Sequence, residues 1–292
     1  MAYRRLHLPD GFVEYVVDGP DDVRGLLIFH VGTPAAAVRW SGLVRAATAA
    51  GLRVASYSRA GYGSSPRREG RSVADEAAIT SVLADRLGYD RFLVAGWSGG
   101  GPVALACAAL LGGRVRACVV LASPAPRLEA GTAWDTLVTP EQRVEWDALR
   151  AGDVAALVPE FEQAVGIFSH ITRRGLRAIG GPPDPRALAH SSNTEVNVDL
   201  VRSMRRAVSS GYFGYLDDNL AQASDWGFRV ANIRVPVVVR HGGLDRLVPI
   251  AHGRWLAEVI PSARGVFLDD AGHGSIALPW TDVIDDLLAA AR

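Results

Sequence analysis

Residues 92–105 read FLVAGWSGGGPVAL: an apolar, strand-like run, then a glycine cluster, then a second apolar segment. Glycine weakens strands and helices because ordering it costs more backbone entropy than ordering other residues. Four glycines at 96–101 therefore indicate a backbone path that only glycine allows, and Ser98 lies in the middle of them. The stretch predicts a tight turn from a strand into a helix, with one serine exposed at the bend.

The segments around this turn alternate between strand-like and helix-like patterns. Apolar and β-branched runs predict strands at 12–18, 26–31, 53–58, 92–96, 115–122, 235–241 and 263–268. Apolar residues at helical spacing predict helices at 38–51, 73–88, 102–113, 249–260 and 281–292. Such alternation is typical of an α/β fold, with a doubly wound, mostly parallel sheet of about eight strands. The run at 12–18 alternates more regularly, and we expect it to form an antiparallel edge hairpin with 26–31.

The alternation stops between about 124 and 226. In this segment the pattern predicts helices at 134–153, 154–171 and 195–223, with a break at 180–187. We therefore expect a core formed by residues 1–123 and 227–292, and a helical cap inserted over residues 124–226.

Composition excludes several classes of protein. The 292 residues are 49% hydrophobic with a formal net charge of +0, which fits a globular domain and lacks the basic surface of a nucleic-acid-binding protein. The arginine-rich stretches at 4–7 and 67–71 are expected in solvated loops. No segment approaches the roughly 20 apolar residues that span a bilayer, and the N-terminus lacks a signal-peptide pattern, so a cytoplasmic location is expected.

No pattern points to a metal or a cofactor. Cys107 and Cys118 lie among small apolar residues and are expected to be buried, unpaired thiols. His7, His170, His190 and His252 have no metal-ligand spacing and are expected to be solvated or capped. A dinucleotide-binding loop is also disfavoured, because the stretch lacks the G-x-G-x-x-G spacing and Pro102 removes an amide. The oligomeric state is not indicated.

The serine has two candidate partners at the same edge of the predicted sheet. Ligands of doubly wound sheets bind beyond the carboxyl ends of the strands. A serine becomes a nucleophile only when a neighbouring base removes its proton. Asp245 follows the strand at 235–241, and His273 follows the strand at 263–268. The chain order Ser, Asp, His, with each residue after a separate strand, is the order of a hydrolase triad.

Three other side chains could take part in this site. Asp269 and Asp270 could replace Asp245 as the carboxylate, although they share a short loop with His273, and reach favours Asp245. His241 could also approach the site, but a histidine that closes a buried strand more often bonds a nearby carbonyl group.

These motifs make the chain resemble the α/β-hydrolase superfamily, and within it the capped serine hydrolases. The resemblance covers 24–123 and 226–292 through HVGTP, SRAGYGSSP, GWSGGG, HGGLDRLVP and AGHGS. It implies Ser98 as the nucleophile, His273 as general base and then acid, and Asp245 as the carboxylate that orients the histidine.

The resemblance also implies an oxyanion hole, with one departure from the family pattern. Relatives usually carry His-Gly-x-Pro, whereas residues 30–34 read His-Val-Gly-Thr-Pro, so Val31 stands at the family's histidine position. His30 is thus not aligned as the loop-shaping residue. The backbone amides of Thr33 and Gly99 are the expected oxyanion donors.

The resulting hypothesis is an enzyme that hydrolyses an ester or a related acyl compound through an acyl-enzyme on Ser98. A cap over the serine suggests a small-molecule substrate with a mid-sized, apolar acyl or alcohol portion. Most of the aromatic residues in the cap are expected to form its core, and some of them should cover the pocket. The aromatic residues concerned are Trp134, Trp146, Phe161, Phe168, Tyr212, Phe213 and Tyr215.

Other functions remain open on the same fold. An aminopeptidase of the proline iminopeptidase type would need acidic cap groups to hold the substrate amine, and the cap has four unplaced carboxylates: Glu160, Glu162, Asp217 and Asp218. Lyase, cyclase or perhydrolysis chemistry can also use an intact triad, and some members of the fold only bind a ligand.

Overall fold

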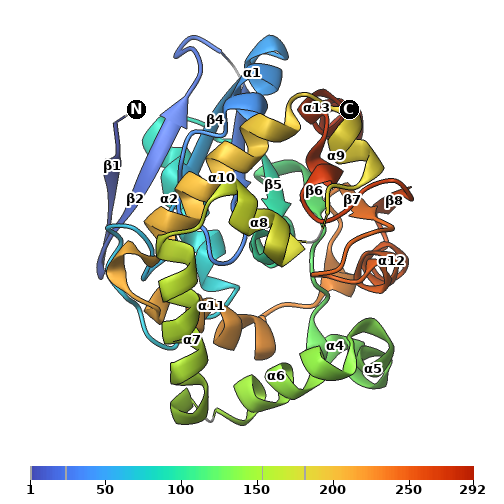
Figure 1. The fold of residues 1–292 in the computed structure, drawn as a ribbon. Helices are drawn as coiled ribbons and strands as arrows, with labels where there is room; N and C mark the ends of the chain where they lie inside the picture. The colour runs from blue at the N-terminus through green and yellow to red at the C-terminus, as the bar shows by residue number, and fades with distance from the viewer. Residues whose placement is uncertain (1, 24, 153, 181) are drawn as a thin grey trace.

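An eight-stranded sheet forms the centre of the protein (Figure 1). The computed structural model describes residues 2–23, 25–152, 154–180 and 182–292. The strand order is β1-β2-β4-β3-β5-β6-β7-β8. β2 is antiparallel to both of its neighbours, β1 and β4, and the pairs from β4 through β3 and β5 to β8 are parallel. The strands are β1 Arg4–Leu8, β2 Gly11–Asp18, β3 Gly25–His30, β4 Leu52–Tyr57, β5 Phe92–Trp97, β6 Val115–Leu121, β7 Val237–Gly242 and β8 Ala263–Leu268. The predicted α/β fold class is confirmed.

Helices cover both faces of the sheet. α1 (Ser41–Ala49) and α13 (Trp280–Ala290) pack on one face. α2 (Asp75–Leu87), α3 (Gly101–Leu110) and α12 (Ile250–Val259) pack on the other. Each face has its own hydrophobic cluster. All six residues of β5 are buried, as expected for a central parallel strand covered from both sides.

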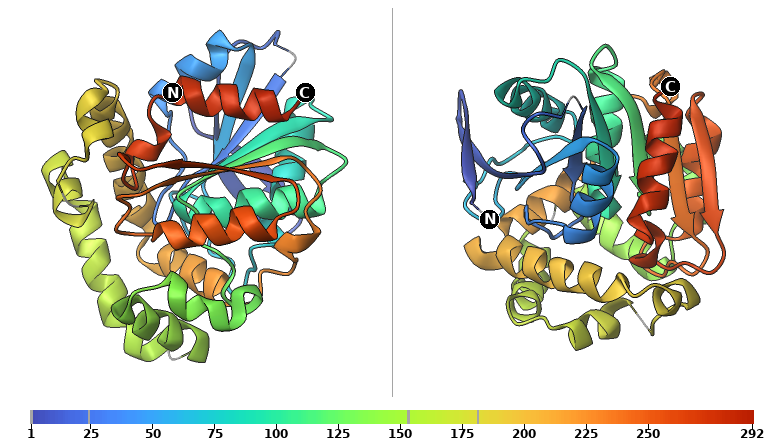
Figure 2. Two further views of the ribbon diagram at one scale, coloured as in Figure 1. Left: turned by 90° about the vertical axis from the view of Figure 1, so that its right-hand side faces the viewer. Right: turned by 90° about the horizontal axis from the view of Figure 1, so that it is seen from above.

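A helical insertion lies between β6 and β7, and the described part of residues 122–236 contains no strand. Its α-helices are α4 Arg127–Ala130, α5 Trp134–Leu137, α6 Pro140–Ala151, α7 Val154–Ser169, α8 Arg173–Gly180, α9 Pro185–Ala189, α10 Asn193–Ala207 and α11 Phe213–Ala223. Drawn green to gold, they form an arc around the core in Figure 2. This segment is called the insertion below.

The insertion is more broken than its periodicity predicts. The helix expected at 134–153 is divided by Thr139, which caps the start of α6 with a capping box. The helix expected at 195–223 is divided at Gly211, whose φ of +95° only glycine adopts easily. The predicted break at 180–187 contains the start of α9, where the Asp184 side chain accepts a hydrogen bond from the Ala187 amide.

Two expectations for the first residues are wrong. The strand at 12–18 does not form a hairpin with 26–31, because β2 pairs with β1 and β4, and β4 lies between β2 and β3. The arginine-rich stretch at 4–7 is not a loop but most of β1, the edge strand. Leu6 explains this: its side chain is buried against the core, while the residues on either side of it face solvent.

Among the described residues, no helix combines the length and the apolar character that crossing a bilayer requires.

Candidate active site

Ser98 stands at the sharp bend that the glycine cluster predicts. It directly follows β5 and begins a short 3₁₀ helix, Ser98–Gly100, that leads into α3. Its φ is +54°, a strained value for a residue with a side chain. A Cβ at Gly96 would lie 2.3 Å from the Gly100 carbonyl oxygen, and one at Gly100 would lie 2.1 Å from the His30 carbonyl oxygen. The glycines thus let β3, β5 and the bend approach closely enough to expose the serine.

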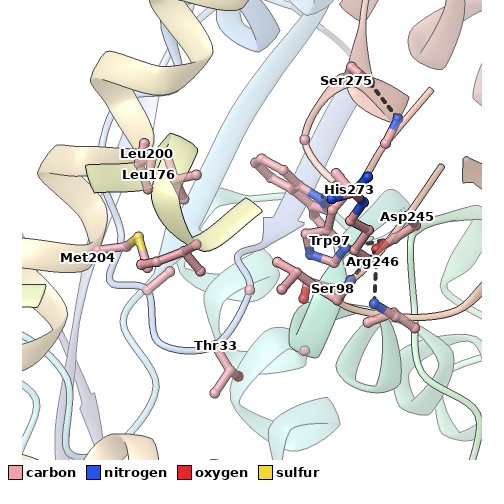
Figure 3. A pocket seen from close by; sticks show the side chains of 18 of the residues that line it. Thr33, Trp97, Ser98, Leu176, Leu200, Met204, Asp245, Arg246, His273 and Ser275 are labelled. Carbon is pink, nitrogen blue, oxygen red and sulfur yellow. Dashed lines mark hydrogen bonds and ion pairs between the residues drawn. The ribbon is translucent and has the colours of Figure 1, made fainter. Parts of the chain in front are cut away.

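Asp245 and His273 meet at the carboxyl ends of β7 and β8. His273 Nδ1 lies 2.8 Å from Asp245 Oδ2. The other carboxylate oxygen accepts hydrogen bonds from the amides of Leu247 and Val248, each at 2.9 Å. Ser98, Asp245 and His273 all line one pocket, and Figure 3 shows them on the same side of it. The structure therefore brings together the three side chains that the sequence singles out.

The electrostatics of this pair favour an ionised aspartate. Burial alone raises the pKa of Asp245, but the charge of His273 and hydrogen bonds from His241 and His273 outweigh burial and hold that pKa well below its usual range. The backbone of His273 is also anchored, since Trp97 Nε1 donates to its carbonyl oxygen at 3.0 Å. The carboxylate can thus hold one imidazole nitrogen while the other faces the pocket.

Of the two competing carboxylates, Asp270 has another partner. Asp270 accepts a hydrogen bond from Arg186 Nε at 3.2 Å. His241 bonds a carbonyl group as expected, with Nε2 at 2.8 Å from the Val248 oxygen, and it also lies 3.4 Å from Asp245 Oδ2. It therefore supports the turn that holds the aspartate.

His252 and His30 are buried away from the pocket lining. His252 was expected to be solvated or capped, but its Nδ1 accepts a hydrogen bond from the Ala125 amide at 3.1 Å inside the core. Burial, with the charge of His241, lowers the pKa of His252 to about 3. Burial and the charge of Arg59 lower the pKa of His30 to about 3 as well. Both imidazoles are therefore neutral near pH 7.

The loop after β3 lies directly against the serine. A Cβ at Gly32 would lie 3.2 Å from Ser98 Cβ, and one at Gly99 would lie 2.3 Å from Thr33 Oγ1. Within the described chain, the Thr33 amide makes no hydrogen bond to the protein. Thr33 and Gly99 both line the pocket. The two amides that the resemblance implies as oxyanion donors thus come from segments in contact beside Ser98.

A buried group of charges lies behind this loop. Asp218 on α11 pairs with Arg59 and Arg71, and Arg71 also lies 3.5 Å from Glu76. The stretch 67–71 is therefore not simply a solvated loop, because the Arg71 side chain is buried. Burial raises the pKa of Asp218, but the two guanidinium groups outweigh it and hold that pKa well below its usual range.

The pocket has a volume of about 890 Å³ and lies between the sheet edge and the insertion. Three of the seven cap aromatics named from the sequence line the pocket, namely Trp146, Phe168 and Tyr215, whereas the other four do not. Aliphatic side chains from α8 and α10 form one wall, among them Leu176, Leu200 and Met204 (Figure 3).

Several lining residues were missed by the reasoning from sequence. Asn193, Asn197, Leu200 and Met204 all belong to α10 and all line the pocket. Their spacing of three to four residues places them on one face of the helix. This periodicity in the sequence could have predicted that they share one surface. Arg246, next to Asp245, also lines the pocket.

Nothing in the described residues forms a group of three or more His, Cys, Asp or Glu side chains that could hold a metal ion. Cys107 and Cys118 are buried and unpaired, as expected from their apolar neighbours.

The chain matches a known protein family and is similar in sequence to a protein named as an esterase. The model of the "Alpha/beta hydrolase family" matches residues 26–290. The chain is 29% identical over 226 residues to the pimeloyl-[acyl-carrier protein] methyl ester esterase of Aromatoleum aromaticum, covering 77% of this chain and 81% of that protein.

Solved structures share the fold, among them a hydrolase and an enol-lactonase. A hydrolase from Pseudomonas aeruginosa matches with a TM-score of 0.70 and 22% identity over 99% of this chain and 97% of that one. The enol-lactonase from Burkholderia xenovorans matches with a TM-score of 0.70 and 20% identity over 98% and 100%.

Proposed function

Because the chain belongs to the alpha/beta hydrolase family, we propose that it cleaves an ester or a related acyl compound through an acyl-enzyme on Ser98. One observation carries the proposal. A serine on a strained turn opens into the same pocket as a histidine whose Nδ1 lies 2.8 Å from a buried carboxylate. The similarity to a protein named as a methyl ester esterase supports ester cleavage.

In the proposed reaction His273 removes the Ser98 hydroxyl proton while the serine oxygen bonds to the substrate carbonyl carbon. The carbonyl electron pair moves to oxygen, and the amides of Thr33 and Gly99 donate to this oxyanion. The intermediate then collapses: the C–O bond to the alcohol breaks, and the imidazolium returns its proton to the leaving oxygen. Water repeats the sequence on the acyl-enzyme to release the acid and restore Ser98. Throughout, Asp245 holds the imidazole in the required tautomer.

The pocket supports a small molecule with an apolar portion as the substrate. The aliphatic wall from α8 and α10 lies opposite the catalytic side chains in Figure 3, so it is the surface against which an acyl or alcohol chain would pack. Residues 124–226 of the insertion, which lies between β6 and β7, would then form a cap over the pocket.

The aminopeptidase alternative is weaker because two of the four acidic groups named for it are paired with arginines, and none of the four lines the described pocket. Asp217 accepts two hydrogen bonds of 2.9 Å from Arg67, and Asp218 is paired with Arg59 and Arg71. None of the four carboxylates singled out in the insertion belongs to the described pocket lining. A substrate amine would therefore not meet any of these four; the carboxylate that the described insertion does bring to the pocket is Asp184, whose Oδ1 accepts a hydrogen bond from the Ala187 amide.

Covalent labelling and turnover together test this function. A fluorophosphonate probe should label the native protein and not Ser98→Ala, and short p-nitrophenyl esters should be hydrolysed far faster than prolyl amides. Cleavage of the amides alone would replace the esterase by a peptidase. Absence of labelling in a folded protein would favour a ligand-binding role instead. Labelling without turnover of any ester would indicate a specialised reaction on the same triad.

A further inference from the structure

Behind the pocket, one buried arginine connects the insertion with the loop that bears Thr33. Arg59 follows β4 and is 2% exposed, and Asp218 on α11 is 3% exposed. Arg59 Nε lies 3.0 Å and 3.2 Å from the two carboxylate oxygens of Asp218, and Nη2 also contacts Oδ2. A charged pair so far from water is costly unless it is fully hydrogen-bonded. The other bonds of this guanidinium therefore decide what the pair does.

Those bonds go to three consecutive residues of the loop. Arg59 Nη1 donates to the Val31 carbonyl oxygen at 2.7 Å, and Nη2 donates to the Gly32 carbonyl oxygen at 2.9 Å and to Thr33 Oγ1 at 3.1 Å. The Thr33 hydroxyl itself donates to Asp218 Oδ2 at 2.6 Å. A planar guanidinium offers several donors in fixed directions, which a lysine cannot do. The loop is therefore held at the carbonyl groups of Val31 and Gly32 and at the Thr33 side chain.

The Thr33 amide itself makes no hydrogen bond within the described chain, and Thr33 lines the pocket, so this amide is free to bind a ligand there. The loop has no helix or strand structure of its own, so its orientation depends on such contacts. α11 also contributes Tyr215, Asn219 and Gln222 to the pocket lining, so the helix that holds Asp218 is part of the pocket wall.

We propose that Arg59 and Asp218 are positioning residues that aim the Thr33 amide at the reacting carbonyl oxygen and couple the wall formed by α11 to that donor. The inference rests on the proposed esterase function and adds to it a group that never touches the substrate. Loss of the pair leaves the nucleophile and base in place and misplaces one oxyanion donor. The effect therefore falls on kcat, since the oxyanion forms only in the transition state.

The chain offers a matched control for this inference. Arg71 is also buried and also pairs with Asp218, but none of its hydrogen bonds reaches residues 31–33. Arg59→Gln and Arg71→Gln therefore each remove one buried guanidinium from the same carboxylate. Only the first removes the bonds to the loop. A purely structural role predicts similar losses of activity in the two variants.

The experiment first measures ester hydrolysis and fluorophosphonate labelling of the wild-type protein, then both variants, with their thermal unfolding. We expect Arg59→Gln to lower kcat about 10- to 100-fold with KM within about threefold, and to slow labelling in parallel. Arg71→Gln should keep kcat within about threefold. Thr33→Val, which keeps the amide but loses the hydroxyl bound to Asp218, should lower kcat less than Arg59→Gln.

Equal kcat losses in the two arginine variants at similar unfolding temperatures overturn the inference and leave the proposed function intact. A wild-type protein that neither labels nor hydrolyses esters overturns the function and the inference with it. If Arg59→Gln does not fold, Arg59→Lys replaces it. The lysine keeps the buried charge but offers one ammonium group for three acceptors, so the same fall in kcat is expected.

Discussion

Adding one methyl group at Gly99 tests the geometry of the proposed oxyanion hole directly. In Gly99→Ala the new Cβ would lie 2.3 Å from Thr33 Oγ1 and 2.8 Å from Thr33 Cβ, whereas ordinary contact begins at 3.4 Å. The threonine cannot rotate away cheaply, because its hydroxyl is bonded to Asp218 at 2.6 Å and to Arg59 at 3.1 Å. The loop must therefore retreat by about 1 Å.

A displacement of that size at a reacting centre costs on the order of 100-fold in rate. We expect Gly99→Ala to lower kcat for a p-nitrophenyl ester by about that factor, and crowding to lower the free energy of unfolding by about 1–3 kcal/mol. Initial rates and urea denaturation measure the two effects. Gly113→Ala is the control, because no heavy atom beyond the glycine and its two chain neighbours lies within 4 Å of the new Cβ. If Gly99→Ala turns over esters as fast as this control, the loop after β3 is not part of the reaction site.

Three further predictions follow from other contacts. His273→Ala should lower kcat by about 10⁴- to 10⁶-fold, Asp245→Asn by less, and Asp270→Asn by under about threefold; a large loss in Asp270→Asn with an active Asp245→Asn would reassign the acid. Folding lowers the pKa of His252 from about 6.5 to about 3. Below about pH 6.5 the unfolded chain therefore binds a proton that the folded chain does not, and the free energy of unfolding falls as the pH falls toward 3. Between pH 6 and 4 the free energy of unfolding of the wild type should therefore fall by about 1.4 kcal/mol per pH unit more than that of His252→Gln, and equal slopes in urea denaturation contradict this assignment. Met204 lines the pocket from α10, so Met204→Trp should reduce kcat/KM for decanoate esters at least about tenfold relative to acetate esters, and an unchanged ratio would remove this wall from the substrate site.

The sequence alone determined the elements whose signal is local. Residues 263–268 form β8 exactly over the predicted range, and β5 and the bend at Ser98 lie where the glycine cluster indicates. The meeting of Asp245 and His273 was also predictable, because the carboxyl ends of parallel strands converge at one edge of the sheet. Their roles in catalysis remain a prediction.

Only the tertiary structure decided which distant segments meet. The pairing of β2 with β4 instead of β3 depends on strand order, and nothing in the alternation of 12–18 specifies it. Arg59 and Asp218 stand 159 positions apart and carry no periodic signal, so their pairing behind the Thr33 loop could not be anticipated. The physical reason is that apolar periodicity records which face of an element is buried, whereas a buried charge is stable only beside a partner that the complete fold supplies.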